Sequence, residues 1–558
     1  MPPSLPEELL VLIFEHLAFP NVHAFADISE ADGIPGPDDD DIEYKAYCDD
    51  IREGIKTLHR ICLASKNLHR LAWPILYRAF TNREPFDPSV DPSNFLRTIC
   101  LKPEYGLALR SLSIGDWNPI EAMDAMDLFE LLQGDATVVA LFQWRAKGFW
   151  FGDDLLMGEN ISLDTMDTAI GTLCRTLNMG LLDGHMSLLL LMCPNIRELD
   201  ISPPLDFGTS TFAKLLNIAT SPAFQNKSLP NPLPDPEEEE SDYIVSQMFA
   251  ASWPERNLQK PRVLQHLRSL KIRSPGPTGL ALDFFKNLIS LPSLQQLQVC
   301  NLWGGYRGSI AALRPVAQCP QLNSLMLPDC RLSSNEVAAI IRCCSGLTSL
   351  TVTWDSLYEM TSDSRDEKWC LKFGDIGEAI ATHTPLLEHL TLDSTDGWLN
   401  FGAQPKRPYI LGSSLADIPR LTRLTIDDHV VYGSEYGRFG FTLGETIPKS
   451  VVWLRLWETR NCETVEDPTL LIDEYLQYQV DDLNAFLQDD NFARLCRVDV
   501  GWDCLDMPTL KNHGWTNETV RLKNAEYGWL RGRVLINKAR LKAMEAEHTC
   551  GWQDIVRD

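Results

Sequence analysis

The sequence has no apolar run that approaches the eighteen or so residues of a membrane-spanning helix. The run LLLLM at 188–192 is far too short. The first ten residues, MPPSLPEELL, lack the basic segment and apolar core of a secretory signal. The 15 cysteines include no Cys-x-x-Cys pair, which favours reduced thiols in a chain without such a signal. These absences predict no membrane partner and a cytoplasmic or nuclear location, or both.

Basic residues are scarce. The chain has 50 lysines and arginines against 77 acids, a formal net charge of -27. Binding to a phosphate backbone requires a basic surface, so this balance argues against a nucleic-acid partner. The expected partners are proteins.

Catalytic and metal-binding motifs are absent as well. The sequence has no HExxH, no Walker loop, no GxGxxG and no GxSxG, and its 11 histidines lack metal-ligand spacing. The pair Cys343-Cys344 is the most tempting nucleophile. Cys344, however, falls on the apolar stripe of a predicted helix, where a cysteine usually acts as a small apolar residue. We therefore expect no enzymatic activity, no metal site and no cofactor.

Instead, a leucine-rich pattern, L-x-x-L-x-L, recurs along the chain. The middle leucines of four consecutive copies, at 270, 297, 325 and 350, are separated by 27, 28 and 25 residues. These intervals are within or close to the range of leucine-rich repeats. A short strand with this pattern cannot bury its apolar face alone, so such units stack on one another. The ten copies end at Ile114, Ile201, Ile272, Val299, Leu327, Val352, Leu392, Ile426, Leu456 and Val500.

One repeat shows a whole cycle. After the strand SLML, Ser333 and Glu336 have the spacing of a helix capping box, an apolar helical stripe follows, and Gly346 precedes the next strand. Repetition of a strand and an antiparallel helix predicts an α/β fold. We expect a leucine-rich-repeat solenoid with parallel strands on its concave side and helices on its convex side.

Strand alternation predicts which side chains face the hollow of this solenoid. If the last two apolar residues of each copy point to the core, their neighbours face the concave side. Towards the C-terminal end these neighbours become aromatic and charged, and Trp and Arg are frequent interface anchors. The alternative is that later segments fold over these side chains and bury them. The predicted substrate-binding residues are Arg423, Trp453, Arg455 and Trp457, with His389, Asp393 and Asp427.

The N-terminal region has a different, helical periodicity. Leu9, Ile13 and Leu17 recur every four residues after a start rich in acids, and a second helical stretch begins at Thr57. Pro74 predicts a break before a last turn.

These two pieces resemble an F-box domain over residues 4–80. The resemblance is carried by Leu5-Pro6-x-Glu8-Leu9 and by the string from Leu63 to Arg78, LASKNLHRLAWPILYR. An F-box implies docking on the Skp-type adaptor of an SCF ubiquitin ligase, and through it on a cullin. The alternative is that these helices only cap the end of a solenoid. The residues expected to bind the adaptor are Leu5, Pro6, Leu9, Ile13, Leu17, Leu63, Leu71, Pro74, Leu76 and Tyr77.

Three regions follow from these patterns: an F-box at 1–80, an irregular repeat region at 95–500, and a capping segment at 501–558. The F-box carries an acidic insertion at about 20–54, and the repeats carry an acidic, Pro-rich one at about 225–245. Residues 27–50 are predicted to form a mobile loop, because too little can be buried there to offset chain entropy.

Taken together, the sequence predicts the substrate-recognition subunit of an SCF-type ubiquitin ligase, similar in plan to leucine-rich F-box proteins of filamentous fungi. Its repeats would hold an unknown protein substrate. The alternative function is a repeat scaffold with no role in ubiquitin transfer, and adaptor binding separates the two.

Overall fold

The structure of the protein is a computed structural model. The described residues form two compact units: one contains the residues up to 273 together with 290–294, and the other contains 280–289 and everything from 295 onward. The fold is mixed α/β with a large, mostly parallel sheet. The described ranges are 5–18, 42–82, 92–115, 182–202, 264–273, 280–304, 319–354, 371–394, 411–432, 441–457, 469–500, 507–524 and 528–547.

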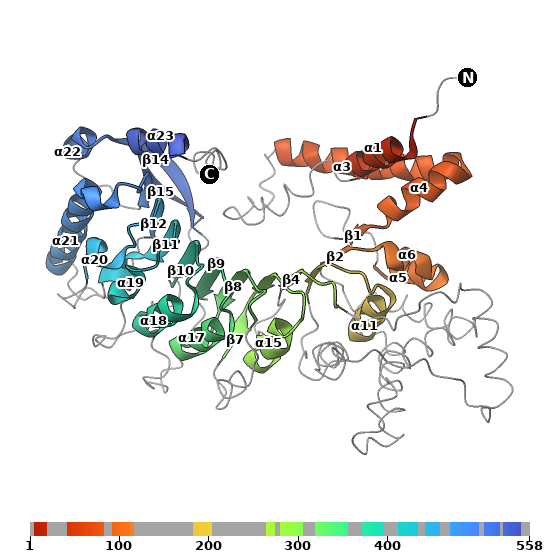
Figure 1. Ribbon diagram of the computed structural model, residues 1–558, viewed down its shortest axis with the longest axis horizontal. Helices are drawn as coiled ribbons and strands as arrows, with labels where there is room; N and C mark the ends of the chain where they lie inside the picture. Colours follow the sequence, from red (N-terminus) through yellow and green to blue (C-terminus); the bar gives the residue numbers. More distant parts are fainter. Residues whose placement is uncertain are drawn as a thin grey trace, which may run out of the picture. The chain divides into compact units, whose positions relative to one another are not determined.

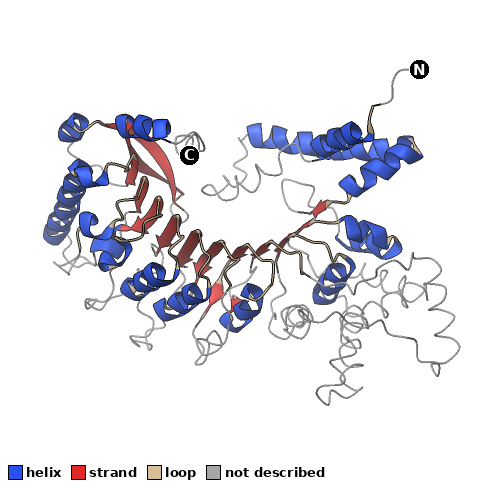
Figure 2. Ribbon diagram, viewed as in Figure 1, coloured by secondary structure: helices blue, strands red, loops and turns tan. Residues whose placement is uncertain are grey.

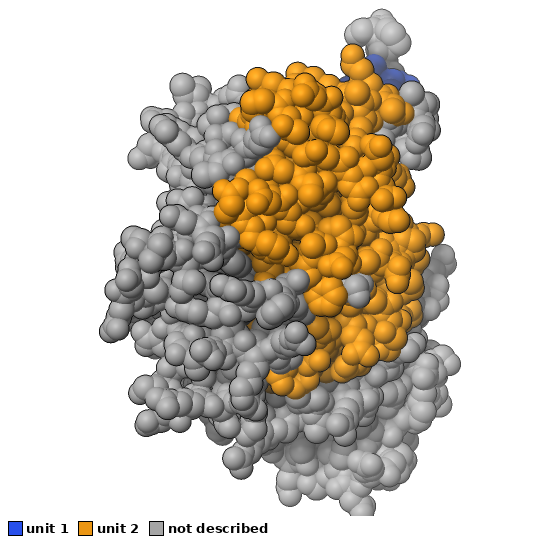
Figure 3. Space-filling model, turned by 90° about the vertical axis from the view of Figure 1, so that its left-hand side faces the viewer, with its two compact units in different colours: residues 1–28, 35–278, 290–294 blue, residues 29–34, 279–289, 295–558 orange. Residues whose placement is uncertain are grey.

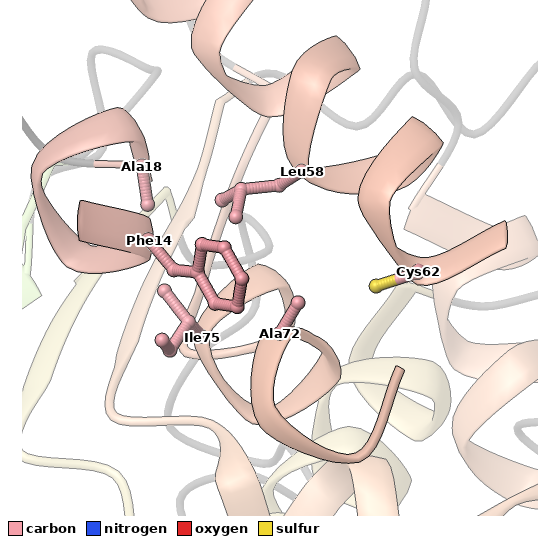
Figure 4. Packing of buried hydrophobic residues seen from close by; sticks show 6 residues of the cluster. All are labelled: Phe14, Ala18, Leu58, Cys62, Ala72 and Ile75. Carbon is pink, nitrogen blue, oxygen red and sulfur yellow. The ribbon is translucent and has the colours of Figure 1, made fainter. Parts of the chain in front are cut away.

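The first unit begins with three helices, α1 (Glu7–Ala18), α3 (Ile42–Ala64) and α4 (Lys66–Leu76). Their apolar faces meet around the ring of Phe14. Figure 4 shows this ring of α1 among side chains of α3 and α4. The buried members of the cluster are Phe14, Ala18, Leu58, Cys62, Ala72 and Ile75.

Two local predictions for these helices are wrong. Helix α3 starts at Ile42, so the loop predicted for residues 27–50 does not extend over 42–50. Ion pairs of Arg52 with Asp49 and of Lys56 with Glu53 join neighbouring turns of α3, which favours helix in this charged stretch. Helix α4 continues through Pro74, because a proline there removes only one backbone donor while the flanking side chains of Ala72 and Ile75 are held in the core. The rest of the predicted loop, 27–41, and the insertion at 225–245 lie outside the described residues.

The sheet of the first unit has four parallel strands in chain order. Three of these strands, β2, β3 and β4, are predicted copies of the pattern. The fourth, β1, is a short edge strand that the pattern did not predict. Three helices, α5, α6 and α11, pack on one another beside it. These elements are β1 (Ala79–Thr81), α5 (Pro92–Leu101), α6 (Pro103–Ala108), β2 (Ser111–Ile114), α11 (Leu182–Met192), β3 (Glu198–Ile201) and β4 (Ser269–Ile272).

In the second unit, seven strands in the order β6-β8-β9-β10-β11-β12-β13 run parallel, and helices cover one face of this sheet (Figures 1 and 2). Figure 3 shows one side of the unit in orange. Two very short strands, β5 and β7, pair separately. The strands are β5 (Leu280–Ala281), β6 (Gln296–Val299), β7 (Leu302–Trp303), β8 (Ser324–Cys330), β9 (Ser349–Trp354), β10 (His389–Asp393), β11 (Arg423–Asp427), β12 (Trp453–Trp457), β13 (Arg497–Val500), β14 (Trp515–Asn524) and β15 (Gly528–Asn537). The helices are α15 (Leu282–Ile289), α17 (Ser334–Cys343), α18 (Phe373–His383), η4 (Gly412–Leu415), α19 (Asp428–Tyr432), α20 (Leu443–Thr446), α21 (Thr469–Gln488), η6 (Asp490–Phe492), α22 (Met507–Asn512) and α23 (Lys538–Glu547).

All ten predicted copies are strands, so this prediction is confirmed. Their last two apolar residues are buried in every case, and the middle ones stand in register from Leu325 through Leu350 and Leu390 to Leu424. The alternation is confirmed on most strands: in β9, for example, Leu350 and Val352 are buried while their neighbours are half-exposed. In each copy, the two buried apolar residues of the strand therefore form part of the apolar core.

One backbone contact repeats at the start of the strands. The carbonyl of the residue just before a strand accepts two N–H groups from the next strand's start. Asn323 O, for instance, accepts from Thr348 N at 2.8 Å and from Ser349 N at 3.0 Å. The same pair of bonds recurs at the carbonyls of Arg78, Arg110, Arg197, Gln295, Thr348, Glu388, Thr422 and Val452. This paired-acceptor carbonyl fixes the register of neighbouring strands at the same point in each repeat.

Helix α17 has the capping box that the sequence predicted. Ser333 Oγ accepts from Glu336 N at 3.4 Å, and Glu336 Oε2 accepts from Ser333 N at 2.8 Å. Gly346, after the helix, is required by a close approach. A Cβ there would lie 1.9 Å from the Pro320 carbonyl oxygen, which leaves room for glycine alone.

We expect Ser333→Ala to lower the free energy of unfolding by about 0.5 to 2 kcal/mol, the range for loss of an N-cap side chain. The substitution removes the side-chain acceptor of the Glu336 N–H at a buried helix start and leaves only the Ser333 carbonyl. Urea unfolding checks this, with Ser333→Thr as the control that keeps an oxygen acceptor. A Ser333→Ala variant as stable as the wild type would show that the Glu336 carboxylate alone holds this end.

The segment after β13 does not continue the parallel sheet. Strand β15 pairs with β13 in the antiparallel sense, and β14 forms the outer strand of the hairpin. Trp515 is fully buried, and its Nε1 donates to the Leu487 carbonyl of α21 at 3.0 Å. Trp515 of the predicted capping segment therefore packs against α21, whereas Tyr527 and the side chain of Trp529 lie outside the described residues.

Among the helices that the structure describes, none has both the length and the apolar character needed to cross a membrane.

Candidate docking surfaces

Helix α1 has two apolar faces, and only one of them is buried. Phe14 and Ala18 point into the helical core, with Leu10, Val11 and Leu17 partly buried against it (Figure 4). A helix of this length with apolar residues on most of its circumference has more apolar surface than its own unit covers.

The other face of α1 lies open to solvent. Leu9 and Ile13 are each 46% exposed, Leu12 is 59% exposed, and Leu5, just before the helix, is 54% exposed. These residues are three or four positions apart, so they form one stripe. Six of the nine large exposed hydrophobic side chains found among the described residues lie between residues 5 and 63. We call Leu5, Leu9, Leu12 and Ile13 the α1 stripe.

Two ion pairs define how α1 lies on α4. Glu7 Oε1 pairs with Arg70 Nη2 at 2.5 Å, and Glu15 Oε1 pairs with Arg78 Nη1 at 2.9 Å. Both pairs join residues 63 positions apart, so the two helices run side by side in the same direction. Leu63, which is 74% exposed, lies in the last turn of α3, three residues before α4 begins.

The ten predicted adaptor-binding residues divide into two groups. Leu5, Pro6, Leu9, Ile13 and Leu63 are exposed, whereas Leu17, Leu71, Pro74, Leu76 and Tyr77 are half-buried. In the second group, Leu17, Leu71 and Leu76 pack against the helical core. Sequence reasoning missed Leu12, although its position three residues after Leu9 places it on the same stripe. The role of all ten in binding stays a prediction.

Tyr77 has a contact outside the helical core. Its ring stacks on Tyr105 of α6 with 4.1 Å between the ring centroids, and Trp73 lies 5.0 Å from the same ring. Burial, and then the neighbouring Tyr105, raises the pKa of the Tyr77 hydroxyl, which stays protonated at neutral pH. This aromatic group joins the three N-terminal helices to the helices beside the first sheet.

The second predicted site lies on β10, β11 and β12, and the structure brings its aromatic and basic members together. The Trp453 ring has three guanidinium groups around it, at 5.4 Å for Arg423, 5.0 Å for Arg455 and 4.4 Å for Arg497. Such distances are typical of cation–π contacts. Arg497 was missed by sequence reasoning, although the alternation rule applied to the tenth copy gives it directly.

A buried carboxylate holds this arginine–tryptophan cluster together. Asp499 Oδ2 accepts from Trp453 Nε1 at 2.9 Å and from Arg455 Nε at 3.2 Å, while Asp499 Oδ1 accepts from Arg497 Nε at 2.9 Å. Asp499 is 0% exposed, Arg455 and Arg497 are each 7% exposed, and Trp453 is 8% exposed. Of the two alternatives for this site, burial as packing is therefore the one observed for Trp453 and Arg455.

The remaining predicted substrate-binding residues have different surroundings. Asp427 is fully buried and accepts from Ser394 Oγ at 2.6 Å, so the expectation that it faces an open hollow is wrong. Asp393 and Arg423 are half-buried, and His389 is exposed. The backbone of Trp457 pairs with Asp427, but its side chain lies outside the described ones.

His389 reaches water, yet the protein atoms around it disfavour its charged form. This desolvation, followed by the positive charge of Arg423 on the next strand, lowers the pKa of His389 to about 4. The neutral ring is therefore the favoured form at physiological pH, and a neutral imidazole has one nitrogen able to donate a hydrogen bond and one able to accept.

The cysteine pair has the environment expected of apolar packing. Cys344 is fully buried, and burial raises its pKa well above the ordinary value, so the reactive thiolate is strongly disfavoured. Burial also raises the pKa of Cys343. Within the described ranges, no three His, Cys, Asp or Glu side chains gather in a way that could hold a metal ion.

Two sequence comparisons with known proteins found no match. No model of a known protein family matches the chain, and no curated protein matches it significantly in sequence.

Proposed function

We propose that the chain is the substrate-recognition subunit of an SCF-type ubiquitin ligase. In this proposal residues 1–80 are an F-box that binds a Skp-type adaptor, and through it a cullin. The strand-and-helix repeats form a leucine-rich-repeat solenoid that holds a protein substrate. The observation that carries the proposal is the α1 stripe, an apolar surface that the helical core leaves uncovered.

The physical argument concerns the second face of α1. Burying a leucine side chain fully contributes roughly 1.5 to 3 kcal/mol, so three α1 side chains and Leu5 that stay about half exposed forgo part of that stabilisation. The helical core has Phe14 on the other face of α1, and this packing leaves the stripe on the outer face. Contiguous exposed apolar residues are typical of protein–protein interaction sites.

One observation favours the alternative, a repeat scaffold with no ubiquitin role. Strand β1 follows α4 and forms the outer edge of the first sheet, pairing with β2 from Ala79↔Ser111 to Thr81↔Ser113. The N-terminal helices are thereby joined to the edge strand, as a cap of a repeat array would be. A cap needs a polar outer face, however, and the α1 stripe is apolar.

Replacing Leu9 and Ile13 together by alanine should weaken adaptor binding by about 1 to 4 kcal/mol, a decrease in affinity of roughly fivefold to nearly a thousandfold. Both side chains are about half exposed, so their loss removes interface contacts with little effect on the core. Isothermal titration calorimetry of the full chain with a purified Skp-type adaptor measures the change, and circular dichroism monitors folding.

The matched control is Leu386→Ala, which truncates a leucine that is 38% exposed on the second unit. We expect this variant to bind the adaptor as the wild type does. If the intact protein gives no binding heat and no co-elution with the adaptor, the ubiquitin proposal is wrong and the scaffold alternative stands. Equal adaptor affinity of the double variant and the wild type would show that the adaptor does not bind through the α1 stripe.

A further inference from the structure

An arginine precedes each of the four parallel strands of the first unit, β1 to β4, by one residue. From the second arginine onward, each backbone N–H donates to the carbonyl of the previous arginine. Arg110 N donates to Arg78 O, Arg197 N to Arg110 O and Arg268 N to Arg197 O, all at 2.7 Å. We call Arg78, Arg110, Arg197 and Arg268 the arginine ladder. Its members are about 4.8 Å apart from strand to strand.

Among the described residues, few acids adjoin this ladder. The next residue on each strand is Ala79, Ser111, Glu198 and Ser269, so the adjoining row has a single carboxylate. The described residues two positions before the arginines are Leu76, Ala108, Asn195 and His266, none of them acidic. Counted together with Glu15, which pairs with Arg78, these described positions hold four arginines against two carboxylates, a local positive charge in a chain with a net charge of -27.

The four arginines differ in how they are held. Arg78 pairs with Glu15, and Arg110 Nη1 donates to the carbonyls of Leu107 at 2.7 Å and Leu109 at 3.0 Å. Arg197 and Arg268 are exposed, and within the described part of the chain neither makes an ion pair. The ladder thus has two guanidinium groups with partners, those of Arg78 and Arg110, followed by the two exposed ones of Arg197 and Arg268.

The charges of the ladder repel one another. Burial, followed by the neighbouring charges of Arg197 and Arg78, lowers the pKa of Arg110. Like charges in adjacent positions are unfavourable on a sheet unless an opposite charge joins them. An added carboxylate would relieve this repulsion and gain charge-assisted hydrogen bonds.

We propose that the arginine ladder is a docking surface for an acidic segment of a partner protein, rich in Asp and Glu. A neutral partner would leave the repulsion unrelieved, and the strongly negative chain disfavours a long nucleic acid. An extended acidic peptide presents side chains on one face about every 6.6 Å, somewhat more than the roughly 4.8 Å between ladder positions. The long side chains of arginine and glutamate can span this difference. The ladder would bind an acidic segment whether or not the chain is a ligase subunit. Only the further statement that this segment belongs to a substrate rests on the proposed function.

The experiment measures binding of a fluorescein-labelled ten-residue polyglutamate peptide to the full chain by fluorescence anisotropy. The variant Arg197→Gln/Arg268→Gln should bind at least tenfold more weakly than the wild type, and Arg197→Lys/Arg268→Lys should bind at an intermediate level. The matched control, Arg342→Gln/Arg420→Gln, removes the same charge from two exposed positions of the second unit and should bind as the wild type does. A polyglutamine peptide should bind at least tenfold more weakly than polyglutamate.

Several results would overturn the proposal. Equal losses in the two Gln variants would mean that net charge alone governs binding. Tighter, Arg197- and Arg268-dependent binding of a single-stranded oligonucleotide would assign the surface to nucleic acid. A tenfold gain in affinity after Glu237–Glu240 are replaced by glutamine would assign the ladder to this chain's own acidic segment. Adaptor binding, measured on the same variants, should stay at the wild-type level, so a failure here is distinguishable from a failure of the F-box proposal.

Discussion

Replacing Asp499 with alanine is expected to lower the free energy of unfolding by about 3 to 5 kcal/mol, the cost of removing one partner from a buried ion pair. The Asp499 carboxylate is shared by Arg455, Arg497 and the Trp453 ring N–H, and all four side chains are buried. Without it, two buried guanidinium groups lose a common counter-charge. Urea unfolding followed by tryptophan fluorescence measures the change.

Two further variants sharpen this test. Asp499→Asn keeps the size of the side chain but not its charge, so it should destabilise nearly as much as alanine if electrostatics dominates. Asp417→Ala removes an exposed carboxylate from the same unit and should change stability by no more than about 0.5 kcal/mol. An Asp499→Ala protein that unfolds at the same urea concentration as the wild type would show that other groups balance the cluster.

Replacing Phe14 with alanine should cost about 3 to 5 kcal/mol, as is usual for loss of a buried aromatic ring. Phe14 is 3% exposed and lies among Leu58, Ala72 and Ile75 (Figure 4). The natural control lies two residues away in the same helix. Leu12 is 59% exposed, so Leu12→Ala should change stability by less than about 0.5 kcal/mol.

Hydrogen exchange of the α1, α3 and α4 amides reports this difference directly. Faster exchange across all three helices is expected for Phe14→Ala and normal exchange for Leu12→Ala. In the adaptor titration, Leu12→Ala should weaken binding although it leaves the fold intact. Equal stability losses for the two variants would mean that the two faces of α1 are not distinct.

The strands could be predicted from the sequence because their signal is local. An apolar pair such as Leu350 and Val352, two positions apart, has the period of a strand. The pattern also repeats often enough to exclude coincidence. The capping box of Ser333 and Glu336 is equally local, since its partners are three residues apart.

Long-range features could not be predicted in this way. Alternation correctly placed Trp453 and Arg455 opposite the apolar core, but it cannot say what covers that side, and both side chains proved to be buried. The antiparallel return of β15 onto β13 has no short-range signal either. Acidic composition suggested a loop up to residue 50, whereas ion pairs within α3 and its packing on α4 favour helix from Ile42.

The arginines of the ladder recur visibly in the sequence, but the sequence alone does not show that they are neighbours in the fold. The strings LYRAF, LRSLSI, IRELDI and LRSLKI each carry an arginine at the same position relative to the strand. Only the backbone contacts between successive arginines show that the four residues lie side by side at the start of neighbouring strands.

Because of the paired-acceptor carbonyl, the distance between neighbouring strands does not depend on the length of the chain that connects them. The middle leucines at 325, 350, 390 and 424 are 25, 40 and 34 residues apart, yet the same two hydrogen bonds join each strand to the next. Doubling a connection adds only about 0.6 kcal/mol of closure entropy. New segments can therefore be inserted between strands, and new surfaces acquired, while the spacing of the existing ones stays constant.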